Sequence, residues 1–147
     1  MGVSSIAKLC KRSDPPKSTE RAFRGRQYEK WARRIYRNKR YRILATNLRK
    51  KWGEIDILAR DPQGVLVVVE VRGRRGSSYS PVNALTNSKI NTLKKLARRV
   101  AFQNNSRTRI EFIEIIGEPP SFWTRLGHGL GLPVPVPRTR IYEINDC

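Results

Sequence analysis

A chain of 147 residues with 38% hydrophobic residues can bury the core of one compact domain, which excludes a purely disordered protein. Lys and Arg outnumber Asp and Glu by 31 to 12, and the resulting formal net charge of +19 favours a polyanionic partner. The excess positive charge lies toward the N-terminus: residues 1–50 carry +13, residues 51–100 carry +6 and residues 101–147 carry zero.

Cysteine usage and hydropathy exclude two further classes of protein. Cys10 and Cys147 lie near opposite ends of the chain without a CxxC pair, which disfavours a structural zinc site and is typical of a reducing compartment. The longest wholly apolar run, Val65 to Val69, is far too short to span a membrane. Charged residues also interrupt the N-terminal region before a signal peptide could form. We therefore expect a cytoplasmic protein without a membrane segment.

Residues 1–20 are predicted to form a basic, flexible extension, because they mix Ser, Lys, Arg and Pro without periodicity. A core domain is expected over residues 21–116, and it begins with an amphipathic helix. Its apolar stripe consists of Tyr28, Trp31, Ala32, Ile35 and Tyr36. Its cationic face consists of Arg26, Lys30, Arg33, Arg34 and Arg37.

Three strand-like runs follow at residues 41–48, 54–60 and 65–72. The sequence from Asp61 to Gly64, Asp-Pro-Gln-Gly, is typical of a hairpin loop between the second and third runs. If Asp61 faces Val65, then Asp56 lies directly opposite Glu70. The third run is apolar on both faces until Glu70, which predicts a central strand.

The same hairpin register makes two further predictions. It places Glu54 opposite Arg72 on the neighbouring strand. It also places Ile55 and Ile57 on one face of the sheet, because side chains alternate along a strand.

A second helix is expected to begin near residues 86–88, with its cationic residues Lys94, Lys95, Arg98 and Arg99 facing outward. Residues 109–116 predict another strand. Residues 117–138 are rich in Gly and Pro and are interpreted as an insertion or arm, in which Phe122 and Trp123 either stack on bases or pack back on the domain. Residues 139–147 are assigned to a C-terminal strand that completes the core. This order predicts an α/β fold with a central mixed sheet.

Asp56 and Glu70 are the strongest candidates for a functional site. Two adjacent carboxylates repel each other unless a cation, a proton or an arginine offsets their charge. Mg²⁺ held by carboxylate oxygens would do so, and a surface salt-bridge network with Arg72 and Arg74 is the alternative. Glu29 is a further candidate, because it is the only acidic residue between residues 21 and 53 and borders the apolar stripe. The alternative for Glu29 is an ordinary ion pair with Arg33.

Several ordered motifs carry a family resemblance over roughly residues 22–116. They are Gly25-x-x-x-Glu29, Tyr41-Arg-Ile-Leu-Ala-Thr-Asn47, Gly53-Glu-Ile-Asp-Ile-Leu-Ala59, Val68-Val-Glu-Val-Arg-Gly-Arg74 and Ser88-Lys89. Together they resemble the YraN family of uncharacterised bacterial proteins. That family is similar to archaeal Holliday-junction resolvases and the PD-(D/E)xK superfamily. The resemblance implies a restriction-endonuclease-like core of helix, three strands, helix and strand.

Residue by residue, the resemblance implies that Asp56 and Glu70 are metal-binding acids, with the carbonyl of Val71 as a further ligand. Glu29 matches the glutamate on the first helix of the resolvases and is the third candidate metal ligand. Arg72 stands where the superfamily has lysine; an arginine stays charged, so it can stabilise a transition state but is a poor general base. The expected nucleic-acid contacts are Lys89, Arg74, Arg75, Lys94, Lys95, Arg33 and Arg34.

Three functions follow as expectations. The first is hydrolysis of DNA phosphodiester bonds with Mg²⁺ or Mn²⁺, in which Asp56, Glu70, Arg72 and Glu29 form the catalytic site. The alternative is a non-catalytic DNA- or RNA-binding module on the same scaffold; a weaker third is an adaptor for an acidic protein surface. DNA is favoured over RNA as the partner. A homodimer is left open, because the resolvases of the superfamily work as dimers.

Overall fold

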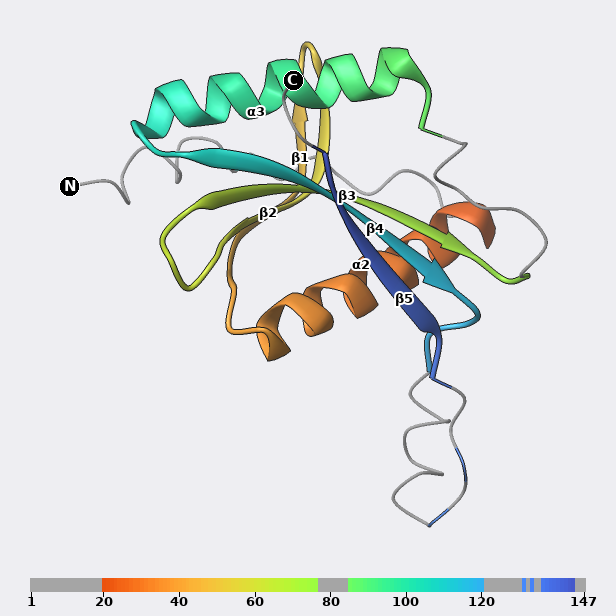
Figure 1. Ribbon diagram of the computed structural model, residues 1–147. Helices are drawn as coiled ribbons and strands as arrows, with labels where there is room; N and C mark the ends of the chain where they lie inside the picture. The colour runs from red at the N-terminus through yellow and green to blue at the C-terminus, as the bar shows by residue number, and fades with distance from the viewer. Residues whose placement is uncertain (1–19, 77–84, 121–130, 132, 134–135, 145–147) are drawn as a thin grey trace.

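The computed structural model describes residues 20–76, 85–120, 131, 133 and 136–144 (Figure 1). The predicted N-terminal extension, both cysteines, Phe122 and Trp123 lie outside the described residues. Within the described residues, no helix has the length and apolarity needed to cross a membrane.

A five-stranded mixed sheet with one helix on each face forms the domain (Figure 1). The strands lie in the order β1-β2-β3-β4-β5, and β3 pairs parallel with β4 while the other pairs are antiparallel. This arrangement confirms the predicted α/β class, the mixed sheet and the central place of the third strand. The elements are α2 (Glu20–Asn38), β1 (Arg42–Lys50), β2 (Gly53–Arg60), β3 (Leu66–Arg74), α3 (Asn87–Asn104), β4 (Thr108–Ile116) and β5 (Arg138–Ile144).

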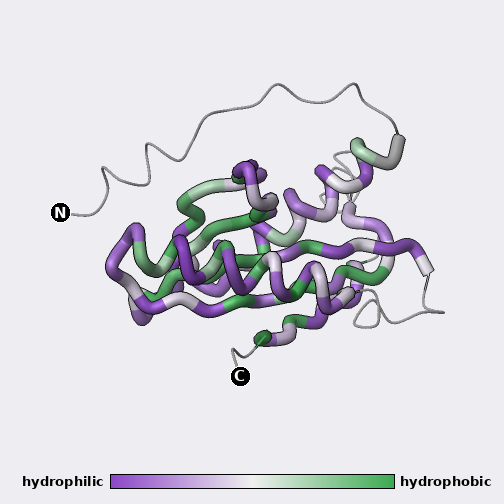
Figure 2. Tube along the Cα trace, turned by 90° about the horizontal axis from the view of Figure 1, so that it is seen from above, coloured by the Kyte–Doolittle hydropathy of each residue, from purple (hydrophilic) through white to green (hydrophobic). Residues whose placement is uncertain are grey.

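The two helices cover opposite faces of the sheet through separate apolar clusters. On one face, Leu93, Leu96 and Val100 of α3 pack against side chains that include Leu58 and Val68. On the other face, Tyr28, Ala32 and Tyr36 of α2 pack against residues that include Ile57 and Val69. Hydrophobic and hydrophilic residues alternate along these helices and strands (Figure 2). The central strand is therefore buried on both faces, as its continuous apolar run predicts.

The register between β2 and β3 agrees with the prediction close to the turn. Leu58 pairs with Val68 and Ile57 with Val69, but the ladder does not continue to Asp56. The prediction that Ile55 and Ile57 share a face is wrong, because Ile55 packs in the cluster under α3 and Ile57 in the cluster under α2. The alternation breaks where β2 parts from β3 and remains paired with β1 alone.

Glu54 also departs from the predicted register. It pairs with Arg49 across the β1–β2 ladder, and the Arg49 Nε to Glu54 Oε1 distance is 3.0 Å. The prediction that Glu54 faces Arg72 is therefore wrong. The physical reason is the same separation of β2 from β3, since beyond Ile57 the residues of β2 find their cross-strand partners on β1.

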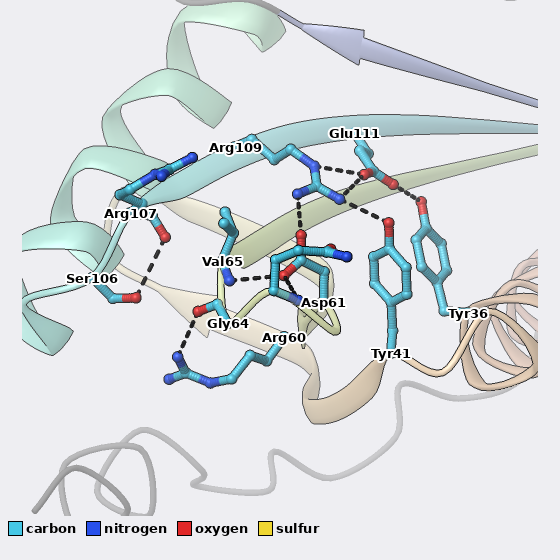
Figure 3. Close-up of polar contacts among 11 residues, drawn as sticks. Tyr36, Tyr41, Arg60, Asp61, Gly64, Val65, Ser106, Arg107, Arg109 and Glu111 are labelled. Atoms are coloured by element: carbon cyan, nitrogen blue, oxygen red, sulfur yellow. Dashed lines mark hydrogen bonds and ion pairs between the residues drawn. The ribbon is translucent and has the colours of Figure 1, made fainter.

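A buried polar network holds the opposite end of the sheet, at the β2–β3 turn (Figure 3). The guanidinium of Arg109 on β4 donates to Asp61, to Glu111 Oε1 at 2.9 Å and to the Tyr41 hydroxyl at 2.7 Å. The Tyr36 hydroxyl donates to Glu111 Oε2 at 2.7 Å. One arginine thus joins α2, the start of β1, the hairpin turn and β4, with its charge offset by two carboxylates.

Asp61 also organises the hairpin turn that the sequence predicts. Its Oδ1 accepts hydrogen bonds from the backbone N–H groups of Gln63 and Val65 at 2.9 and 2.8 Å. Burial alone would raise the pKa of Asp61, but the hydrogen bonds from Arg109 and from these two N–H groups outweigh it and lower the pKa.

We expect Asp61→Asn to lower the free energy of unfolding by about 1–2 kcal/mol at pH 7, because it removes the charge that pairs with Arg109. A lowered pKa stabilises the fold above the unfolded value near 4, and that stabilisation is lost as pH falls through the folded pKa. Urea denaturation of both proteins between pH 7 and pH 2.5 should therefore show the difference shrinking with acid. A difference that stays constant over this range would contradict the proposed role of the charge.

Candidate functional site

A cleft of about 500 Å³ opens between α2 and the C-terminal part of β3. Four arginines and two carboxylates contribute to its lining: Arg24, Arg72, Arg74, Arg75, Glu29 and Asp56. Basic walls of this kind raise the local concentration of anions. The cleft lining therefore combines cationic and acidic groups.

Two glycines shape the cleft wall. The ring of Tyr28 lies directly on the backbone of β3 at Gly73, where an added Cβ would be 2.0 Å from Tyr28 Cγ. Gly25 also lines the cleft, and no heavy atom lies within 4 Å of the place its Cβ would take. The contact at Gly73 sets the approach of α2 to the sheet, and it thereby positions Glu29, the residue after Tyr28.

Asp56 lies where β2 parts from β3. Its Oδ2 accepts a hydrogen bond from the backbone N–H of Val71 at 2.8 Å, so the side chain bridges the two strands beyond the end of their ladder. Burial and, next, the nearby charge of Glu70 raise the pKa of Asp56 to about 7, against the lowering effect of the Val71 N–H. Asp56 and Glu70 are thus close in space, as predicted, although they are not a ladder pair.

Glu70 is a buried carboxylate held by two cations. Its side chain is 1% exposed, Arg72 Nη2 lies 2.8 Å from Oε1 and Lys89 Nζ lies 2.9 Å from Oε2. Lys89 is positioned by the start of α3, where the Thr86 side chain accepts from the Lys89 N–H and caps the helix. The site therefore joins β3 to the first turn of α3.

The alternative of a surface network around Glu70 is wrong in two respects. Glu70 is buried, and Arg74 pairs with Glu114 rather than with Glu70, at 3.0 Å between Arg74 Nη2 and Glu114 Oε1. Of the predicted surface network, the structure contains only the ion pair between Glu70 and Arg72.

Glu29 reaches the cleft from α2 and is held by β1. Asn47 Nδ2 donates to Glu29 Oε2 at 2.9 Å, and Asn47 has a φ of +50°, a left-handed conformation that asparagine tolerates. No ion pair joins Glu29 to Arg33 in the described part of the chain, so the alternative of a simple helix pair is wrong. Sequence reasoning included Asn47 in a motif but gave it no role.

The three predicted acidic ligands are not gathered into one group. Each carboxylate has its own partner: Val71 for Asp56, Asn47 for Glu29, and two cations for Glu70. Among the described residues, no three His, Cys, Asp or Glu side chains form a group that could hold a metal ion. The pair of Asp56 and Glu70 is the part of the predicted set that the fold brings together.

The predicted nucleic-acid contacts fall on separate surfaces. Arg33 and Arg34 belong to α2, while Lys94 and Lys95 belong to α3 on the opposite face of the sheet (Figure 1). Arg75 lines the cleft and pairs with Glu118, at 2.5 Å between Nε and Oε1. The predicted cationic contacts therefore lie in three places: the cleft, helix α2 and helix α3.

The fold and the cleft define an α/β protein with a basic, carboxylate-containing site at the C-terminal end of the central strand of a mixed sheet. The model of the uncharacterised protein family UPF0102 matches residues 28–115, and the chain belongs to this family, which is the YraN family of the sequence resemblance.

Relatives in other bacteria agree with this assignment. A UPF0102 protein of Thermus thermophilus is 36% identical over 108 residues, covering 73% of this chain and 94% of the relative. One from Aquifex aeolicus is 40% identical over 78 residues, covering 53% of this chain and 73% of the relative.

Among solved structures, a chain in a complex titled EndoMS-dsDNA2 is similar with a TM-score of 0.35 and 16% identity. The match covers 76% of this chain and spans half the length of that one. The family match, and not this structural likeness, identifies the chain.

We expect Gly73→Ala to lower the free energy of unfolding by about 1–3 kcal/mol, because the new methyl group would overlap the Tyr28 ring. Gly25→Ala is the matched control: it lines the same cleft but adds its methyl group in open space within a helix. The control should be neutral or slightly stabilising. Equal unfolding midpoints for the two variants in urea would contradict this account of α2 placement.

We expect Asp56→Asn to stabilise the protein at pH 8 in EDTA by on the order of 2–4 kcal/mol. The asparagine oxygen can still accept from the Val71 N–H, while the buried charge is removed. Because the pKa of Asp56 in the folded state is raised to about 7, the folded chain keeps a proton that the unfolded chain releases near pH 4. The free energy of unfolding of the natural protein should therefore decrease as the pH rises from about 4 to about 7.

Urea denaturation of natural protein and Asp56→Asn at pH 3.5, 5.5 and 8 measures this effect. The increase in the free energy of unfolding caused by Asp56→Asn should be small at pH 3.5 and largest at pH 8. A variant less stable than the natural protein at pH 8 would show that the Asp56 charge supports the fold.

Proposed function

We propose that this chain is a restriction-endonuclease-like, PD-(D/E)xK protein that hydrolyses DNA phosphodiester bonds with Mg²⁺ or Mn²⁺. The observation that supports this most is the position of Asp56, which lines an arginine-rich cleft and lies close to the buried Glu70. A carboxyl group whose pKa is shifted and that lies in a cleft of opposite charge is characteristic of a functional site.

The carboxylate pair fits a hard divalent cation. Burial and the charge of Glu70 both disfavour an ionised Asp56, and a divalent ion between the two would reverse that effect. Mg²⁺ and Mn²⁺ prefer oxygen ligands, and Mg²⁺ is commonly held by one or two carboxylates together with water and phosphate. Asp56 and Glu70 would hold the ion, with the Val71 carbonyl as a further oxygen donor. A bound ion would polarise the scissile phosphate and lower the pKa of the attacking water.

Arg72 and Lys89 supply the positive charge for the reaction. Both contact the Glu70 carboxylate, so they lie where a phosphate near that carboxylate would develop additional negative charge. Arg72 can donate two hydrogen bonds to phosphate oxygens but keeps its proton. Two further arginines of the cleft, Arg74 and Arg75, would bind and orient the DNA backbone.

A non-catalytic DNA- or RNA-binding module is the second candidate. It is favoured by the state of Glu70, whose charge is already offset by Arg72 and Lys89. An arginine in place of the superfamily lysine also leaves the site without a proton shuttle at that position. This candidate retains the basic surfaces and loses the need for metal.

The cleavage test compares labelled single-stranded, duplex and four-way-junction DNA in Mg²⁺ or Mn²⁺. We expect Asp56→Asn and Glu70→Gln each to lower cleavage by about a hundredfold or more. Glu54→Gln is the matched control, because Glu54 lies on the same strand as Asp56 but pairs with Arg49 outside the cleft. It should cleave like the natural protein, and thermal unfolding of each variant checks that the fold is intact.

Two outcomes would contradict the nuclease proposal. Metal-dependent cutting that survives in both cleft variants would place the chemistry elsewhere. An absence of cutting by any protein, together with tight binding that weakens steeply with salt, would support the binding module.

A further inference from the structure

Two large aromatic side chains outside the cleft are exposed to solvent. Trp52, in the turn between β1 and β2, is 40% exposed, and Phe102, in the last turn of α3, is 89% exposed. Neither contributes to the apolar clusters that hold the helices on the sheet. Core packing therefore does not account for these two rings.

Arg99 contacts one ring and shares a helix side with the other. The guanidinium carbon of Arg99 lies 3.9 Å from the centroid of the Trp52 ring. On α3, Lys95 is four residues before Arg99 and Phe102 is three residues after Arg99, so the three side chains share one side of the helix. We call the surface of Trp52, Lys95, Arg99 and Phe102 the α3 patch.

The turn that carries Trp52 is fixed against α3. Gly53 has a φ of +144°, and an added Cβ there would lie 2.8 Å from Thr92 Cγ2 and 3.1 Å from Leu96 Cδ1. This close approach requires glycine and holds the adjoining Trp52 in place. The α3 patch is thus presented by a helix and a tightly docked turn.

Charge defines the partner class for the α3 patch. Helix α3 has no acidic residue in its sequence, and its outer face carries Lys95 and Arg99. Exposed rings next to guanidinium groups match the requirements of unpaired bases, which stack on aromatic faces while cations bind the adjacent phosphates. Bases inside a continuous duplex are already stacked and cannot reach such rings.

We propose that the α3 patch binds single-stranded nucleic acid by stacking bases on Trp52 and Phe102. This inference rests on the nucleic-acid binding proposed above and adds a preference for an unpaired strand. Lys89, which contacts Glu70, and Arg99 of the patch are ten residues apart on α3, which corresponds to about 15 Å along the helix. The bound strand therefore runs along α3, with its stacked bases several nucleotides from the phosphate at Glu70.

The test measures binding in EDTA, without cleavage, by fluorescence anisotropy of a labelled dT oligonucleotide and of a duplex of equal length. We expect Trp52→Ala and Phe102→Ala each to weaken single-strand binding by about five- to a hundredfold and duplex binding by less than about twofold. Phe102→Leu should lose as much as Phe102→Ala, because it retains apolar area without a ring. Trp52→Phe should retain most of the affinity.

The matched control is Phe23→Ala, which removes a ring that is 52% exposed on α2, the helix on the other face of the sheet. It should bind both oligonucleotides like the natural protein. The salt dependence of single-strand binding should have the same slope in all the aromatic variants, because no phosphate-binding cation is removed.

Unchanged single-strand binding in both patch variants would overturn the inference. Equal losses for single strand and duplex would also overturn it, since they indicate a general loss of surface or fold. A selective loss supports the stacking role even if the protein cleaves nothing, so failure of the nuclease proposal is distinguishable. If the natural protein binds neither oligonucleotide, both proposals fail.

Discussion

The negative charge of a carboxylate buried in the central strand of a sheet has to be offset by cations. The arrangement of side chains around Glu70 follows from that constraint. Glu70 is 1% exposed on β3, and an isolated charge at such a depth would be prohibitively costly. Arg72 offsets it from the same strand and Lys89 from the first turn of α3. Removal of one partner from a buried ion pair is more damaging than the pair is stabilising, so the position of α3 and the charge of Glu70 are interdependent.

The departure of β2 from β3 creates the rest of the site. Beyond Ile57 the two strands no longer pair, and the Asp56 side chain instead accepts the Val71 N–H. The gap lets α2 approach through Tyr28 and Gly73 and bring Glu29 to the same cleft. A local break in the ladder thus replaces backbone hydrogen bonds between β2 and β3 with a contact from the Val71 N–H to the Asp56 side chain.

The sequence predicted the elements of the fold closely and the cleft only in part. The continuous apolar run of β3 predicted its central place, and the Asp-Pro-Gln-Gly turn predicted its register with β2 close to the turn, because local patterning and turn chemistry carry that information. Extrapolating this register failed at Ile55 and Glu54, because it assumes that the two strands stay paired. The Asn47 contact with Glu29 and the buried network around Arg109 depend on residues distant in the chain, which no local pattern reveals.

The network around Arg109 has a consequence for how this protein can change. It fastens the β2–β3 turn, the start of β1 and β4 at the end of the sheet where β2 and β3 remain paired, beyond the stretch in which they separate at the cleft. The Arg109 network and the cleft therefore lie at different ends of the same strands. Because no cleft residue belongs to this network, the cleft lining can vary at Glu29 and Asp56 while the anchored end of the sheet is retained.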